Sequence, residues 1–172
     1  MNSTNPGTIL DVMLGVRINH TWPADLTMTL IHPDGTEVTL TDHNGNGSHR
    51  DGTEVWGEGS RSCNGDLAYF SQTAPQSIID RSKPFTGFSR PVDNLNILEG
   101  KDAAGDWTLR IVDGWAQDDG ELFCAQLLLA TSNPDTTEII DSQTSMNDET
   151  AIWNLPDPVS YTHLRAHETV SD

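Results

Sequence analysis

The sequence predicts an all-β fold, a jelly-roll-like β-sandwich of about eight antiparallel strands. Apolar residues occupy every second position from Leu10 to Ile18, and Trp107, Leu109 and Ile111 alternate with polar neighbours in the same way. This period of two is that of a strand with one buried face. The expected core comprises Val12, Val16, Leu26, Leu30, Trp107, Leu109 and Ile111.

Polar turns separate the expected strands. The sequence Pro33-Asp34-Gly35 lies between two alternating segments, which is typical of a hairpin. An acidic turn with a glycine precedes Trp107, and a second acidic turn precedes the returning strand. We therefore expect, in chain order, a strand at 8–18, a corner at 19–25, a hairpin at 26–40, a surface loop at 41–64, a strand at 107–112 after the turn 102–106, and a strand at 122–129 after the turn 113–120.

Changes in composition divide the 172 residues into four parts. Residues 1–7 form a polar N-terminal segment that does not resemble a signal peptide, so a leader is expected upstream in a longer precursor. Residues 8–131 form the sandwich, and residues 132–158 are expected to be an acidic polar linker or tail. Residues 159–169 resemble the translation of a sequencing-library adapter, so we interpret 159–172 as a non-native tail.

Composition excludes several classes of function. The chain has 26 acidic and 9 basic residues and a formal net charge of −17, so its surface repels nucleic acid and anionic lipid. No apolar run approaches the roughly 20 residues of a membrane-spanning helix. The serines lack a Gly-x-Ser-x-Gly setting, and we predict that the chain is not an enzyme.

Four spaced motifs resemble one known family. The segment 19–26 contains the corner residues His20, Thr21, Asp25 and Leu26, and the segments 61–67 and 84–91 follow, the latter with Gly87. The last motif contains Gly100, Gly105, Trp107, Asp113 and Gly120. In this order the motifs resemble the P domain (P/Homo B) that follows the catalytic domain of proprotein convertases and other subtilisin-like serine proteases. The resemblance covers about residues 8–131.

This resemblance implies a non-catalytic, extracellular, secreted or cell-surface domain. Its partner would be an adjacent catalytic or other domain of a longer precursor, which it would stabilise or assist. By the same resemblance Cys63 and Cys124 would form a disulfide; the alternative is two unrelated thiols. Two other functions remain open: an independent, calcium-dependent binding or adhesion module for an extracellular protein or glycan ligand, and a structural unit of a surface assembly.

Calcium is the cofactor that the acidic turns suggest, because hard cations prefer carboxylate and carbonyl oxygens. The alternative is that these carboxylates cap turns or face solvent, and for His20 and Asp25 we favour a structural role in the corner. In the exposed loop, Asn46 is the candidate for glycosylation. The candidate calcium ligands are Asp25, Asp66, Asp102, Asp106, Asp113, Asp118 and Asp119.

Overall fold

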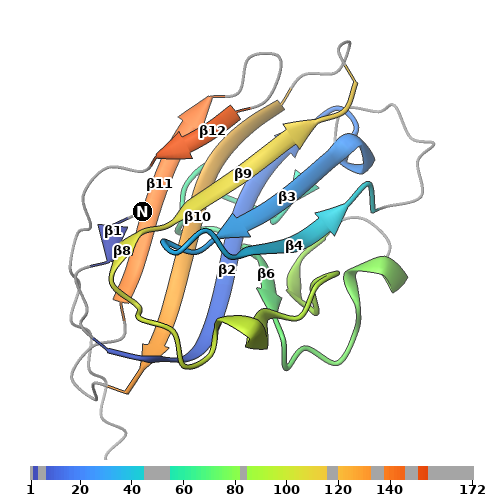
Figure 1. Cartoon of the computed structure of the whole chain (residues 1–172). Helices are drawn as coiled ribbons and strands as arrows, with labels where there is room; N and C mark the ends of the chain where they lie inside the picture. Colours follow the sequence, from blue (N-terminus) through green and yellow to red (C-terminus); the bar gives the residue numbers. More distant parts are fainter. Residues whose placement is uncertain are drawn as a thin grey trace, which may run out of the picture.

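Two β-sheets pack face to face in the computed structural model (Figure 1). The model describes residues 2–3, 7–44, 55–81, 85–115, 120–132, 138–145 and 151–154. One sheet has the strand order β11-β10-β2-β6-β7, with β5 also paired to β2, and the other has the order β12-β9-β3-β4. The all-β sandwich that the sequence predicts is confirmed.

The strands comprise those expected from the alternating segments, shorter ones in the loops, and two in the segment after residue 131. In the larger sheet they are β2 (Ile9–His20), β5 (Val55–Trp56), β6 (Ala68–Ser71), β7 (Gly87–Ser89), β10 (Gly120–Thr131) and β11 (Glu138–Ser145). In the smaller sheet they are β3 (Leu26–Ile31), β4 (Glu37–Asp42), β9 (Thr108–Asp113) and β12 (Ala151–Asn154). A two-stranded ribbon, β1 (Asn2–Ser3) with β8 (Gly105–Asp106), and the 3-10 turns η1 (Pro23–Asp25), η2 (Ile78–Asp80) and η3 (Leu95–Leu98) complete the described elements.

The core lies between the two sheets, where the apolar faces of β2, β10, β3 and β9 meet. The seven residues predicted for the core are all at most 2% exposed. The prediction for Leu10 is wrong. The sequence placed its side chain on the buried face, but Leu10 is 58% exposed and Ile9 is buried. A β-bulge between Ala130 and Thr131 shifts the register against β2, and such a bulge changes which face successive residues occupy.

Pairing is antiparallel throughout the described strands except between β6 and β7, which run parallel. The sequence predicted antiparallel strands only. Parallel strands need a crossover connection, and the chain between β6 and β7, which includes η2, supplies it. No described helix is long and apolar enough to cross a membrane.

The segment predicted as a linker or tail contributes one strand to each sheet. Strand β11 pairs with β10 from Glu121 to Leu129, and β12 pairs with β9. The sequence expectation differs here because strand addition uses backbone hydrogen bonds, which a polar composition does not prevent. Without these additions β10 and β9 would be edge strands with unpaired backbone groups. The division of the chain into domains otherwise stays a prediction.

Candidate functional site

Two buried histidines lie at opposite ends of β3, and each fastens a corner of the sandwich. The first, His20, ends β2, and its side chain is only 1% exposed. Its Nδ1 accepts the backbone N–H of Trp22 at 3.0 Å, so the ring proton lies on Nε2. Nε2 donates to Oδ2 of Asp113 at 3.0 Å. The ring therefore ties the turn after β2 to the end of β9.

The other motif residues of this first corner surround the same pair. Leu26 is fully buried at the start of β3, and the backbone N–H of Gly114 donates to the carbonyl of Asp25 at 2.9 Å. Gly120 packs so closely on the His20 ring that a Cβ there would overlap it. Asp25 and Thr21 are both half-buried. The first and last predicted motifs thus meet in one place.

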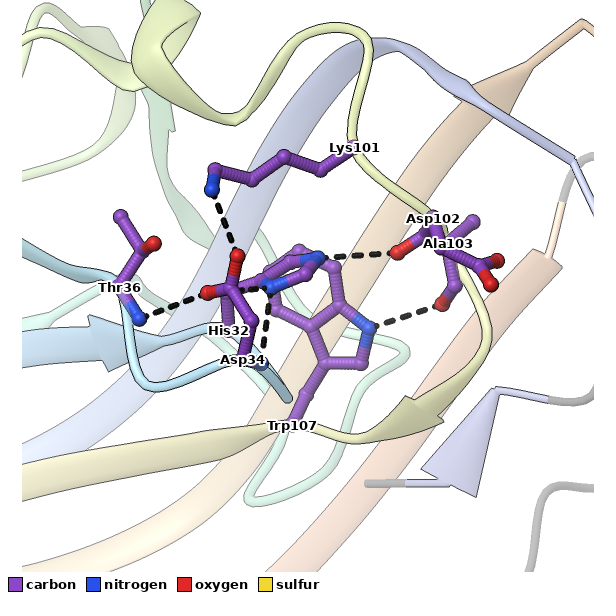
Figure 2. A network of polar contacts seen from close by, with 7 residues as sticks. All are labelled: His32, Asp34, Thr36, Lys101, Asp102, Ala103 and Trp107. Atoms are coloured by element: carbon purple, nitrogen blue, oxygen red, sulfur yellow. Dashed lines mark hydrogen bonds and ion pairs between the residues drawn. The ribbon is translucent and has the colours of Figure 1, made fainter.

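The second histidine, His32, lies at the end of β3 against Trp107 (Figure 2). Its Nε2 donates to the carbonyl of Asp102 at 2.9 Å. Its Nδ1 lies 3.1 Å from the backbone nitrogen of Asp34, whose N–H it accepts, and 2.9 Å from Oδ1 of the same residue. The imidazole meets the indole edge-on, with ring centroids 4.8 Å apart. The indole Nε1 in turn donates to the carbonyl of Ala103 at 3.1 Å. These contacts join the β3–β4 turn to the chain that leads into β9.

An ion pair covers this second corner on its solvent side. The ammonium of Lys101 lies 2.6 Å from Oδ2 of Asp34, and the backbone N–H of Thr36 donates to Oδ1 at 2.8 Å (Figure 2). These hydrogen bonds, that of Lys101 foremost, hold the pKa of Asp34 well below its usual range. Gly105 has a φ of +117°, and a Cβ there would lie 2.8 Å from Pro33, so the two turns touch at a position that requires glycine.

Sequence reasoning missed this second corner. It interpreted His32 to Thr36 only as a tight turn, although a histidine directly before Pro-Asp-Gly was a signal. A buried ring nitrogen needs a partner, and the partner of Nε2 is the carbonyl of Asp102, about seventy positions away in the sequence. Spacing within the turn could not indicate that partner.

Neither buried histidine has a ring nitrogen available to activate a nucleophile. Both nitrogens of His20 and of His32 are engaged within the fold. His43 is exposed, but Asp42 and the hydroxyl of Thr27 both meet its Nδ1, at 2.7 and 3.4 Å. In a catalytic triad the carboxylate and the nucleophile meet opposite nitrogens. Among the described residues, His20 and His32 therefore hold turns together.

The candidate calcium ligands do not gather in one place among the described residues. Asp113 belongs to the first corner, Asp102 lies at the second, and Asp66 pairs with Glu58 in a separate loop. Two of them cap turns: Asp113 accepts the N–H of Trp115 at 3.0 Å, and Asp102 accepts that of Ala104 at 3.1 Å. No group of three or more His, Cys, Asp or Glu in the described part of the chain is arranged to hold a metal.

The remaining predicted site residues fall into two groups. Asp25 lies in the first corner and Asp106 in β8, whereas Asp118, Asp119 and Asn46 lie outside the described residues. Gly87 and Gly100 have φ values of +66° and +77°, which favour glycine. Calcium binding and glycosylation stay predictions. Cys63 and Cys124 form a disulfide with their Cα atoms 5.3 Å apart.

The chain is thus a β-sandwich domain that contains a disulfide and in which two buried histidines hold the turns together. Residues 9–68 match the family model of the proprotein convertase P-domain. The matched range contains His20 and His32, the histidines of the two corners. The match confirms the resemblance found in the sequence. The P-domain is an accessory domain of subtilisin-like proteases and is not itself the catalytic one. The motif from Gly100 to Gly120 lies beyond the matched range.

Among solved structures, the chain is similar to one in the crystal structure of the Aeromonas sobria serine protease (ASP) in complex with the chaperone ORF2. The identity is 16% and the TM-score 0.37, and the alignment covers 88% of this chain and 20% of that one. The chain thus spans about a fifth of the length of that structure's chain. No curated protein matches.

Proposed function

We propose that this chain is the non-catalytic P domain of a secreted subtilisin-like serine protease, or of another exported multidomain protein, and that it stabilises or assists the attached domain. The family match over residues 9–68 carries the proposal. Further support comes from the buried histidines, whose ring nitrogens are engaged in the corners. A disulfide in the sandwich is in keeping with an oxidising, extracellular environment.

On this proposal the partner is the neighbouring domain of a longer precursor. Interfaces between domains of one chain are commonly of moderate size, so the effect on the neighbour is a shift in stability or folding yield. The two histidine corners keep the sandwich rigid, and a rigid sandwich can hold a fixed surface against its neighbour. The corners themselves would not touch substrate.

The experiment begins with the gene that encodes the longer precursor. We expect an upstream domain with the Asp, His and Ser of a subtilisin-like protease. The precursor is then expressed with and without residues 1–172, and the yield of soluble, active protease is measured. A clear loss of yield on deletion is expected. Adhesin modules or repeats upstream, or an unchanged yield, would instead favour an independent binding module.

A matched variant separates stabilisation by the domain from the mere presence of extra chain. In the precursor, His20→Ala removes both hydrogen bonds of the first corner. His43→Ala changes an exposed histidine at the same end and serves as the control. If the proposal holds, His20→Ala lowers the yield of active protease and His43→Ala does not.

A further inference from the structure

A short loop, here called the flap (residues 57–66), covers part of the outer face of the larger sheet between β5 and β6. Its base is a pair of backbone hydrogen bonds between Glu58 and Asp66, at 2.7 and 3.0 Å. Gly57 and Gly65 are required there, because a Cβ on either would lie 2.5 or 2.6 Å from a carbonyl oxygen of the opposite arm. The base is therefore closely packed.

The tip of the flap lacks a comparable anchor. No residue from Glu58 to Asp66 is a buried apolar side chain, and most of these residues are exposed and polar. What joins the tip to the sheet is the disulfide from Cys63 to Cys124 of β10 and the guanidinium of Arg61, which lies 5.0 Å from the ring of Phe123. Burial alone would not hold the tip in place.

Beneath the flap lies a charge that is poorly satisfied. Arg17 of β2 is 7% exposed, and its guanidinium lies 5.3 Å from the same Phe123 ring that Arg61 covers. Its Nη1 donates to the carbonyl of Ile18 at 3.3 Å, but its Nε–H is buried without a partner. Burial and the charge of Arg61 lower the pKa of Arg17, while Glu58 opposes them. A buried donor without an acceptor destabilises the closed flap.

The two cysteines differ in exposure. Cys63 is half-buried on the flap, whereas Cys124 is fully buried in β10, where it pairs in register with Arg17. A thiolate from solvent would therefore attack Sγ of Cys63, and Cys124 would leave as the thiolate. The guanidinium groups of Arg17 and Arg61 lie over the ring of Phe123, the residue before Cys124, and positive charge near a thiolate favours it.

We propose that the Cys63–Cys124 disulfide is a thiol-sensitive latch that holds the flap over Arg17 and Phe123. A dithiol reductant attacks Sγ of Cys63 and forms a mixed disulfide, and Cys124 departs as a thiolate that takes up a proton. The second thiol of the reductant then displaces Cys63, so the reductant becomes a disulfide and the protein gains two thiols. The tip of the flap opens and hydrates Arg17, while both sheets stay folded.

Hydrogen exchange read by mass spectrometry tests this on the full 172-residue chain, oxidised and after dithiothreitol. Alkylation of two thiols confirms complete reduction, and near-ultraviolet circular dichroism confirms the folded sandwich. We expect exchange in residues 59–65 to rise at least tenfold on reduction, with peptides from β2 and β10 unchanged. Unchanged exchange in the flap would overturn the proposal. Loss of protection throughout both sheets would also overturn it, because the disulfide would then be a structural cross-link only.

A variant tests whether the buried guanidinium promotes opening. Arg17→Met keeps the aliphatic part of the side chain and removes the unpartnered donor. In the reduced protein it should slow exchange in the flap at least threefold relative to reduced wild type. Arg90→Met, a half-buried arginine on the far side of β7, is the control and should have no effect. If Arg17→Met does not fold, Arg17→Leu makes the same comparison, since leucine has no donor. No slowing in either variant would contradict the proposed latch.

Discussion

Replacing His32 by alanine should destabilise the sandwich far more than the same replacement of an exposed histidine. The change removes the donor to the Asp102 carbonyl, leaves the backbone N–H of Asp34 without its acceptor, and deletes the edge-on contact with Trp107. Each hydrogen bond contributes about 0.5–1.5 kcal/mol. The aromatic contact contributes about the same amount beyond the area that it buries. The expected loss is therefore about 2–4 kcal/mol.

Urea unfolding followed by tryptophan fluorescence measures this loss, since Trp107 is buried beside the histidine. A domain of this size has a total stability of about 5–15 kcal/mol, so the variant should remain folded with a clearly lower midpoint. His43→Ala is the matched control, because its side chain is 58% exposed, and it should change stability by less than about 0.5 kcal/mol. A loss for His32→Ala as small as that of His43→Ala would refute the reasoning.

Three further predictions concern charge, calcium and the disulfide. Because the pKa of Asp34 is held below its usual range, its pairing with Lys101 stabilises the fold fully above about pH 4, and this contribution decreases progressively as pH falls further. A double-mutant cycle of Asp34→Asn and Lys101→Met should give a coupling energy that is largest near neutral pH and decreases below about pH 4. A coupling energy independent of pH would contradict this prediction. If the acidic turns bind calcium, the midpoint of thermal unfolding should be higher in calcium than in chelator. At a calcium concentration of a hundred times Kd, the stabilisation is about 2.7 kcal/mol. Equal midpoints would exclude a specific site. Replacing both cysteines by serine should lower the free energy of unfolding by about 4 kcal/mol in the chain-entropy model, because the disulfide closes a sequence separation of 61 residues. Urea titration measures this loss, and an unchanged free energy of unfolding would contradict the prediction.

The sequence predicted the parts of the fold that depend on local pattern. The alternation in β2, β3 and β9 identified the buried faces because each strand has one face in the core. It failed at Leu10, where a bulge set by the partner strand changes the face that Ile9 and Leu10 occupy. It also missed β11 and β12, because adding a strand depends on an edge elsewhere in the fold, which is not visible in the composition of residues 132–158.

In the site, too, the sequence predicted what depends on local pattern and missed what depends on distant residues. The corner around His20 was visible because its residues form a short motif, and the structure brings that motif together with Asp113 and Gly120. The contact of His32 with Trp107 joins residues that no local pattern relates. The two arginines around Phe123 were likewise not predicted, since Arg17 belongs to β2, Phe123 to β10 and Arg61 to the flap, and no local pattern relates the three.

Calorimetry of the longer precursor determines whether this sandwich acts on a neighbouring domain. The thermal unfolding of the two-domain protein is compared with that of the separated domains. We predict that the neighbouring domain unfolds at a higher temperature when the sandwich is attached, and that His20→Ala removes part of the gain while His43→Ala does not. Two independent transitions at the temperatures of the separated domains would mean that the sandwich does not stabilise its neighbour.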